Sequence, residues 1–266
     1  MPQRFLWWMA GVARGDFGTT VTGRPVTDEL RIRAVTSAWL YLPATVLAVV
    51  AGCVLGVRSA RRRSDAMGLL TTVIVLALPA FVLGTLLKIF WLPVNELAGT
   101  QLLYFSGERS PGAPDGWAGA VDRLQHLILP TLCIAIPQAV YYARYQRATA
   151  LDVIDSSYVR AARLRGLPAR TAFRRHGLRT ALVPMTSMFA FGFGIHLASG
   201  VFAERVFGWH GLGSWLLESI SGHDAMVCAS IVLILAVLVV GAGWLADITA
   251  YALDPRMRDG RQAVGP

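Results

Sequence analysis

The sequence is poor in charged residues and in cysteine. Only 15% of its 266 residues are Asp, Glu, Lys or Arg, whereas 55% are hydrophobic, and the mean hydropathy is +0.51. This balance is typical of a polytopic membrane protein and not of a soluble domain. The three cysteines, Cys53, Cys133 and Cys228, lie in or beside apolar segments without the spacing of metal ligands, so we interpret them as small buried hydrophobic residues.

The motifs of several enzyme classes are also missing from the sequence. It contains no Gly-x-x-x-x-Gly-Lys-Ser/Thr phosphate loop, no Gly-x-Ser-x-Gly elbow and no His/Cys cluster at metal spacing. We therefore expect no catalytic residue, no metal site and no ATP hydrolysis by this chain itself. The first residues lack the apolar core of a secretory signal peptide, so we expect none there.

Five apolar runs are long enough to cross a bilayer, which takes about 20 residues at 1.5 Å per residue. They cover residues 36–57, 67–90, 127–143, 181–203 and 225–251. The third run is the shortest and contains Pro130 and Pro137, so we expect a kink or a tilt there. The predicted fold is an all-α polytopic membrane protein with three parts: an N-terminal segment (1–35), a transmembrane domain (36–253) and a C-terminal tail (254–266).

The positive charge, formally +9, is concentrated in three of the connections between these runs. Four arginines lie in 58–63, nine in 144–179 and three in 256–261, together 16 of the 25 basic residues. The positive-inside rule places these three segments and the C-terminus in the cytoplasm, and the N-terminal segment and the connections 91–125 and 204–224 outside. Nucleic-acid binding is the alternative explanation of the charge. We expect no such partner, because the sequence has no basic domain with interleaved aromatic residues.

The arginine-rich connection at 151–184 is predicted to fold as a helix, a turn and a second helix. Tyr158 to Arg165 favours a helix that ends at Gly166, which permits a positive φ, and Pro168 can begin a second helix of about four turns reaching Val183. Ala161 and Ala162 would let another surface approach the first helix closely. The alternative is an amphipathic helix whose arginines bind anionic lipid, and residue chemistry alone leaves both open.

The residues of this connection resemble a known motif. The run Tyr-Val-Arg-Ala-Ala-Arg-Leu-Arg-Gly at 158–166, followed by Arg-His at 175–176 and Leu-Arg-Thr-Ala-Leu-Val-Pro at 178–184, resembles the EAA loop of ABC importer permeases of the dipeptide and oligopeptide type. In that family the loop forms a coupling helix that docks into a groove of a cytoplasmic ATPase. Arg160 replaces the glutamate that names the motif, which leaves the detailed contacts open. The resemblance implies ATPase coupling through Tyr158, Arg160, Ala161, Ala162, Gly166 and Leu167.

Five further segments match the same family in the same order. They are Arg-Gly-Asp-Phe-Gly at 14–18, Trp-Leu-Pro at 91–93, His-Leu-Ile-Leu-Pro at 126–130, the run from Glu204 to Gly213, and Asp-Pro-Arg at 254–256. The family's B-type permease has a transmembrane helix before the first of these segments, and this sequence does not contain it. We expect either an upstream start site or a protein that works with five spans. The former is favoured, because six spans put both termini in the cytoplasm.

The resemblance implies the transmembrane fold of a type I ABC importer, forming half of a translocation pore in a bacterial inner membrane. The implied cargo is a di- or oligopeptide delivered by an extracytoplasmic binding protein. The other implied partners are a second homologous permease, the lipid bilayer and cytoplasmic ATPase subunits that bind ATP and Mg. A permease for nickel or another small solute is the nearest alternative. A secondary transporter or a membrane scaffold with a lipid-binding basic loop is an alternative of a different class.

Three residues are candidates for the translocation path or its gate. His196 lies well inside the apolar run 181–203 among glycines and serines, and Glu204 and Trp209 follow where that run ends. A packing role for His196, and interfacial anchoring by tryptophan at Trp209, are the alternatives. Lys88 lies near the end of a run, so we expect its side chain to extend to the membrane interface.

Overall fold

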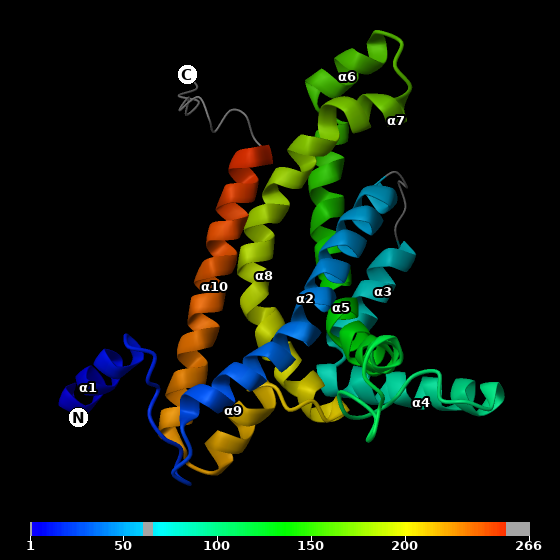
Figure 1. Ribbon diagram of the computed structural model, residues 1–266. Helices are drawn as coiled ribbons and strands as arrows, with labels where there is room; N and C mark the ends of the chain where they lie inside the picture. Colours follow the sequence, from blue (N-terminus) through cyan, green and yellow to red (C-terminus); the bar gives the residue numbers. More distant parts are fainter. Residues whose placement is uncertain (1, 61–65, 254–266) are drawn as a thin grey trace. The chain divides into compact units, whose positions relative to one another are not determined.

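Residues 2–60 and 66–253 are described by a computed structural model, which is helical apart from loops and one isolated bridge between Thr19 and Pro25 (Figure 1). The predicted tail at 254–266, with its Asp-Pro-Arg motif, and Arg61 to Arg63 of the first basic connection lie outside the described residues. The helices, in chain order, are α1 (Pro2–Val12), α2 (Val26–Ala60), α3 (Ala66–Ala77), α4 (Ala80–Ala98), α5 (Trp117–Ile154), α6 (Ser157–Leu164), α7 (Ala169–Ala172), η1 (Phe173–Gly177), α8 (Leu178–Phe207), α9 (Leu212–Ser221) and α10 (Ala225–Leu253).

The chain divides into two compact units, and each takes residues from α2, α5, α8 and α10. The first unit consists of Met1–Ala44, Pro79–Ile134 and His196–Leu238. The second unit consists of Thr45–Leu78, Ala135–Ile195 and Val239–Pro266. The predicted ATPase-coupling segment therefore belongs to the second unit, and Glu204 and Trp209 belong to the first.

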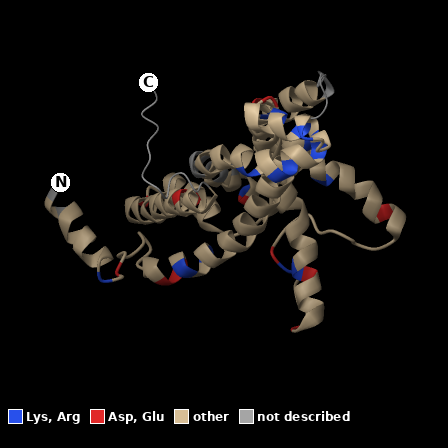
Figure 2. Ribbon diagram, turned by 90° about the horizontal axis from the view of Figure 1, so that it is seen from above, with Lys and Arg blue, Asp and Glu red and all other residues tan. Residues whose placement is uncertain are grey.

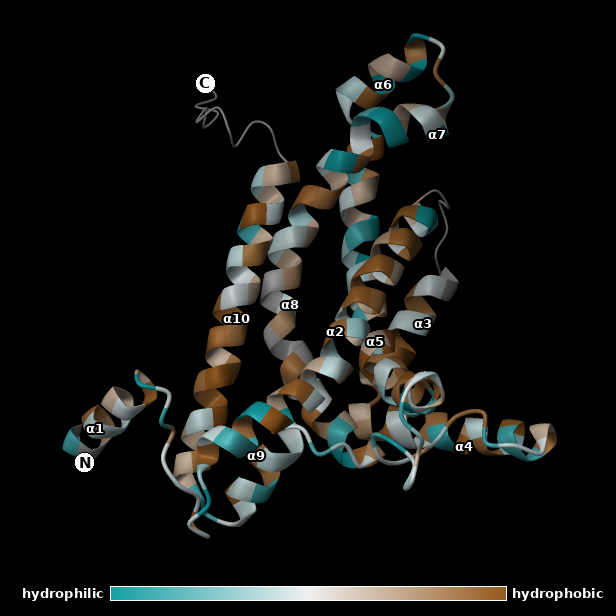
Figure 3. Ribbon diagram, in the orientation of Figure 1, coloured by the Kyte–Doolittle hydropathy of each residue, from teal (hydrophilic) through white to brown (hydrophobic). Residues whose placement is uncertain are grey.

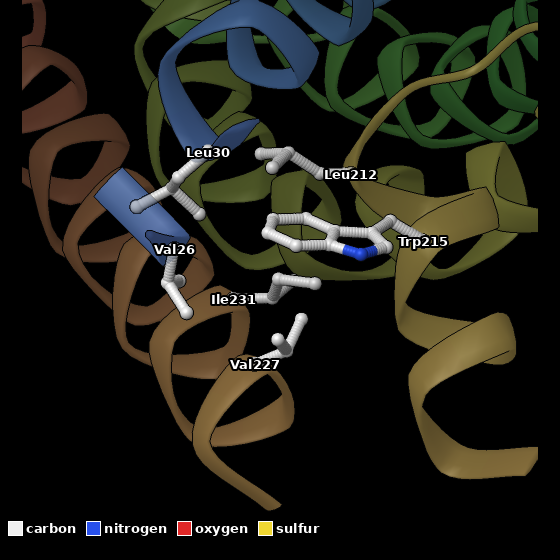
Figure 4. Close-up of a cluster of buried hydrophobic side chains, with 6 residues drawn as sticks. All are labelled: Val26, Leu30, Leu212, Trp215, Val227 and Ile231. Carbon is white, nitrogen blue, oxygen red and sulfur yellow. The ribbon is translucent and has the colours of Figure 1, made fainter. Parts of the chain in front are cut away.

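The core of the first unit joins the start of α2 to α9 and α10, two consecutive helices near the other end of the chain. Val26 and Leu30 of α2 pack with Leu212 and Trp215 of α9 and with α10 (Figure 4). Trp215 is 7% exposed. Burying an aromatic or branched aliphatic side chain stabilises a fold by about 1.5–3 kcal/mol. This cluster holds α9 against the start of α2.

The second unit depends on close packing of α2 against α5 through two glycines. A Cβ atom placed on Gly52 would lie 2.5 Å from Cβ of Tyr142, and one on Gly56 would lie 2.6 Å from Cβ of Gln146. Only glycine leaves room for the two backbones at these positions. The spacing of four residues is that of the Gly-x-x-x-Gly motif, which brings membrane helices together.

The predicted single crossing at 67–90 is wrong, because the chain there forms two helices, α3 and α4, separated at Leu78 and Pro79. Proline has no N–H for a continuing helix, and its ring disfavours helical backbone at the residue before it. Pro79 instead takes the N-cap position of α4, with ψ of 144°. The other four predicted runs lie within α2, α5, α8 and α10.

Several helices have the length and composition of membrane spans. Among the described residues, α2, α4, α5 and α10 are each long and apolar enough to cross a bilayer. Apolar residues run along α10 (Figure 3), and many of them are exposed, including Trp244 at 71% and Ile248 at 66%. An exposed apolar surface of this extent is expected where lipid takes the place of water.

Lys88 has a structural role in the first unit, and its position at the membrane interface stays a prediction. Its ammonium group donates a hydrogen bond to the carbonyl of Val206 and lies 4.8 Å from the ring centroid of Phe207. These are the last two residues of α8, where helix carbonyls have no partner within the helix. Lys88 therefore caps the C-terminus of α8 from α4, which is favourable for a cation.

Candidate functional site

Helix α6 (Ser157–Leu164) has one buried face and one exposed face. Val159 and Ala162, three residues apart, are 1% and 8% exposed and face the second unit's interior. Tyr158, Ala161 and Leu164, also spaced by three, form the opposite face, on which Leu164 is 84% exposed. The methyl group of Ala162 is covered by its own segment, and a role of Ala162 in ATPase coupling stays a prediction. Ala161 keeps the exposed position that was expected of it.

The turn after α6 requires glycine. Gly166 has φ of 92°, and a Cβ there would meet no atom within 4 Å, so backbone conformation alone restricts the residue. The Leu167 N–H donates to the Ala162 carbonyl at 3.3 Å, and the Gly166 N–H donates to that of Arg163 at 3.0 Å. This is a Schellman-type helix end, with Leu167 packed against Val159 and Ala162. The predicted helix break and positive φ are confirmed.

A second helical stretch begins after Pro168, as predicted, but it does not end near Val183. It consists of α7 (Ala169–Ala172) and a π-helical turn, η1 (Phe173–Gly177), which continues directly into α8. Ala172 is fully buried and completes the cluster beneath α6. The stretch of α7 and η1 is thus continuous with α8, which contains the predicted membrane run 181–203.

Gly177 lies where the end of α5, the inner face of α6 and the start of α8 meet. A Cβ atom at this position would lie 2.8 Å from Cγ1 of Val153, 3.0 Å from Cδ2 of Phe173 and 3.2 Å from Cγ2 of Val159. These distances leave no room for a side chain without movement of its neighbours. The junction is therefore tightly packed, so α6 cannot shift without displacing the ends of α5 and α8.

Buried hydrogen bonds join α5 to α8 just behind this junction. Gln146 is fully buried, and its Nε2 donates to the carbonyl of Ala181 at 3.0 Å. The Thr149 hydroxyl donates to the same carbonyl at 3.1 Å. A helix carbonyl that accepts two side-chain donors fixes the two helices in register, because breaking the pair leaves buried polar groups unsatisfied. Ala181, Ala150 and Phe173 pack beside this contact.

The outer surface of the segment is strongly basic. In Figure 2, seen from above, the residues drawn in blue gather over this part of the chain. The exposed arginines of the segment are Arg160, Arg163, Arg165, Arg170, Arg174 and Arg175. Within the described ranges, none of these six forms an ion pair with an acidic side chain. Such a surface suits an acidic partner.

The structure places Glu204 in the first unit, in the interior of the protein. The Glu204 side chain is completely buried, and the Ser37 hydroxyl donates to its Oε1 at 2.6 Å. Its Oε2 accepts the Ser214 N–H at 2.8 Å, while the Leu212 N–H donates to the Ser37 hydroxyl at 2.8 Å. Leu212 and Ser214 are the first and third residues of α9. Glu204 and Ser37 therefore cap α9 from α8 and α2, and a role for Glu204 in the translocation path stays a prediction.

Trp209 is packed inside the first unit, at 1% exposure, and its backbone N–H donates to the Glu204 carbonyl at 2.8 Å. This burial does not suit the alternative of an exposed interfacial anchor. The backbone of His196 belongs to α8, but its side chain lies outside the described residues, so its role also stays a prediction. His196 and Trp209 belong to the first unit, whereas α6 belongs to the second.

Sequence reasoning missed Gln146 and the Gly52–Gly56 pair. The glycine pair has a signal, since Gly-x-x-x-Gly in an apolar run predicts close helix contact. Gln146 has none, because its acceptor lies 35 residues further along the chain. Among the described residues, no group of three His, Cys, Asp or Glu side chains could hold a metal ion.

The sequence is similar to known proteins over most of its length. Residues 44–259 match the model of the family described as binding-protein-dependent transport system inner membrane component. The oligopeptide transport system permease protein OppB of Mycobacterium tuberculosis is 43% identical over 259 residues, which are 96% of this chain and 80% of that protein. The glutathione transport system permease protein GsiC of Pectobacterium atrosepticum is 33% identical over 264 residues, 97% of this chain and 80% of that protein.

The matched range includes α6, α7, the Gly177 junction and Glu204, but not Ser37. The GsiC protein of Salmonella typhimurium is similar over the same extent, with 32% identity over 261 residues, 96% of this chain and 79% of that protein. The chain therefore belongs to the family of binding-protein-dependent transport system inner membrane components, the permease subunits of ABC importers.

Proposed function

We propose that this chain forms half of the translocation pore of an ATP-driven importer whose cargo is a di- or oligopeptide. The proposal draws on the printed functions of its relatives, which are permeases for oligopeptides and for glutathione. The peptide is delivered by an extracytoplasmic binding protein. A second, homologous permease subunit completes the pore, and ATP and Mg bind to partner ATPase subunits.

The proposed location of the chain is a bacterial inner membrane, which it crosses several times. The basic connections and the C-terminal tail at 254–266 face the cytoplasm, and residues 1–35 face outward. In this topology the 151–184 segment meets the cytoplasmic ATPase, and the transmembrane domain at 36–253 surrounds the path.

One observation carries the coupling role: α6 exposes an apolar stripe on a rigid base. Tyr158, Ala161 and Leu164 form that stripe, and Leu164 is 84% exposed although leucine gains from burial. Arg160 and Arg163 lie beside it on the same helix, and Arg165 follows at the helix end. A groove on an ATPase with apolar walls and an acidic rim complements this surface, as a helix-in-groove contact requires.

The packing beneath α6 explains how motion at the surface reaches the membrane helices. ATP binding closes the ATPase dimer and draws the two coupling segments of the pore together. Because the close packing at Gly177 and around Val159 leaves no room for α6 to shift alone, α6 moves with the ends of α5 and α8. The hydrogen bonds from Gln146 and Thr149 to the Ala181 carbonyl then carry the displacement along both helices. ATP hydrolysis reverses the movement, which gives alternating access.

Replacing Leu164 tests the docking role directly. In the reconstituted complex, Leu164→Asp is expected to abolish co-purification of the ATPase subunits while membrane insertion stays normal. Leu97→Asp is the matched control, since Leu97 is 91% exposed and lies on α4, in the other unit. Wild-type ATPase retention by Leu164→Asp would remove the coupling role from α6.

Uptake measurements test the cargo and the energy source. Proteoliposomes containing the full complex and the binding protein are expected to accumulate labelled peptide only with internal ATP. Accumulation of nickel without peptide uptake would assign the chain to the small-solute alternative. Peptide uptake by the permease without ATPase subunits would instead indicate a secondary transporter.

A further inference from the structure

The second unit contains a groove that the proposed coupling role leaves unused. It is an open groove of about 540 Å³ lined by α3, α5 and α8. Leu69, Val73 and Leu76 of α3 form one side, and Tyr141, Arg144 and Tyr145 of α5 form the other. Met188 of α8 lies on the lining as well. All of these residues belong to one compact unit, so the groove is a property of that unit.

The α3 side of the groove is apolar. Leu69, Val73 and Leu76 are 50%, 58% and 45% exposed, and they follow one another along one face of the helix. Thr72 lies among them, but its hydroxyl donates its proton to the Gly68 carbonyl at 2.7 Å. This wall therefore offers contact area to hydrocarbon and no free hydrogen-bond donor.

The α5 side supplies a free positive charge. Arg144 is exposed, and within the described ranges its guanidinium has no ion pair or hydrogen bond. The adjacent Tyr145 likewise has no hydrogen bond among the described residues, whereas Tyr141 donates to the sulfur of Met188 at 3.8 Å. A guanidinium binds phosphate through two parallel hydrogen bonds, and a tyrosine hydroxyl can add a third.

The position of Arg144 in the sequence gives the environment of this charge. It follows directly on the apolar run 127–143 and begins the stretch of nine arginines that ends at Arg179. In the proposed topology this places it at the cytoplasmic surface of the membrane, where anionic lipids lie and where basic pockets between helices bind their head groups. Tyrosine is enriched at the same depth.

We propose that the groove is a binding site for one anionic phospholipid, with its phosphate at Arg144 and Tyr145 and an acyl chain along Leu69, Val73 and Leu76. The ligand has the same division into a charged end and a hydrocarbon end as the groove. A bound lipid fills the space between α3 and α5 and ties α3 to the helix that leads into the coupling segment. The inference uses the proposed membrane orientation but not the identity of the cargo.

Native mass spectrometry of the complete transporter, titrated with phosphatidylglycerol in mild detergent, tests the site. Wild-type complex is expected to hold one phosphatidylglycerol per copy of this chain more tightly than phosphatidylcholine. Arg144→Gln should weaken that binding at least about tenfold, since it removes a hydrogen-bonded charge. Arg58→Gln is the matched control, because Arg58 is an exposed arginine outside the groove. Val73→Trp blocks the hydrocarbon side and should lower binding without a change of charge.

Several other outcomes would overturn the lipid-binding proposal. Equal binding by wild type and Arg144→Gln, or equal losses in Arg144→Gln and Arg58→Gln, shows that no specific site exists. If Arg144→Gln leaves lipid binding unchanged but takes up free-carboxylate peptides less well than amidated ones, Arg144 belongs to the peptide path. If a groove variant leaves lipid binding unchanged but the second permease is lost from the complex, the groove belongs to a subunit interface. Lipid counts do not depend on ATP-driven uptake, so a wrong cargo assignment remains distinguishable from a wrong lipid site.

Discussion

Ser37 and Glu204 are joined by a hydrogen bond of 2.6 Å, although 167 positions separate them in the sequence. The bond links α2 to the C-terminal part of α8, and both side chains also accept backbone N–H groups of α9. The N-cap residue of α9 is Gly211, which provides no side-chain cap. The start of α9 is thus held by two other helices.

Removing the Glu204 carboxylate is expected to destabilise the first unit. In Glu204→Ala the Ser214 N–H and the Ser37 hydroxyl lose their acceptor inside the protein, at a cost of about 1–3 kcal/mol or more. Thermal unfolding of the purified complex measures the effect. Glu218→Ala is the control, because Glu218 is 44% exposed and its two ion pairs are long, at 3.7 Å. Equal melting temperatures for the two variants would show that the cap is not needed.

Gly177→Ala is expected to disturb the coupling junction. The added methyl group would lie 2.8 Å from Val153, so the ends of α5 and α8 must separate or strain; overpacking of this kind costs about 1–3 kcal/mol. Binding-protein-stimulated ATPase activity should fall, with basal hydrolysis less affected. Gly241→Ala on α10 is the control, since a Cβ there meets nothing within 4 Å. Full stimulation in Gly177→Ala would contradict a tight junction.

Substitution of Gly166 separates conformational strain from steric contact. A Cβ at Gly166 has open space, but φ of 92° is unfavourable for residues with a side chain. We expect Gly166→Ala to lower the stimulated ATPase rate and Gly166→Asn, which tolerates positive φ better, to retain more of it. Gly166→Pro should uncouple the complex completely, without loss of membrane insertion. The reverse order of Ala and Asn would show that strain is not the cause.

The features that could be predicted from the sequence are local ones. Gly166 and Pro168 mark the turn between two helices because glycine and proline restrict the backbone at their own positions. Pro79 likewise indicates a helix break. The apolar run around it outweighs this indication in the sequence, so the sequence predicts one helix where α3 and α4 form.

The features that could not be predicted depend on contacts between distant segments. Ala161 and Ala162 are neighbours of identical chemistry, and only the packing of Val159 and Ala172 determines which of them is buried. The acceptor role of Glu204 depends on Ser37, and the capping role of Lys88 depends on the end of α8. No local pattern specifies either partner.

The distribution of arginines predicts the membrane orientation, which thiol labelling can check. In a background without native cysteines, a cysteine replacing Ser156, Ser64 or Gly260 should resist an impermeant reagent applied from outside. A cysteine replacing Gly112 or Ser221 should react. Labelling of Ser156→Cys from outside would invert the orientation and with it the cytoplasmic position of α6.

Ala161 and Ala162 provide a matched pair that separates docking from packing. Ala162→Leu adds three carbon atoms to a side chain that is 8% exposed and covered by Val159 and Ala172, so we expect a loss of about 1–3 kcal/mol in stability. Ala161→Leu adds the same atoms on the exposed face, where they meet solvent in the free permease. Its melting temperature should equal that of the wild type, while its affinity for the ATPase should change because the contact stripe has a new shape. Measuring thermal unfolding of the isolated permease and ATPase binding on both variants gives four values. If Ala161→Leu binds the ATPase as the wild type does, the stripe of Tyr158, Ala161 and Leu164 is not the docking surface, even if Ala162→Leu unfolds early.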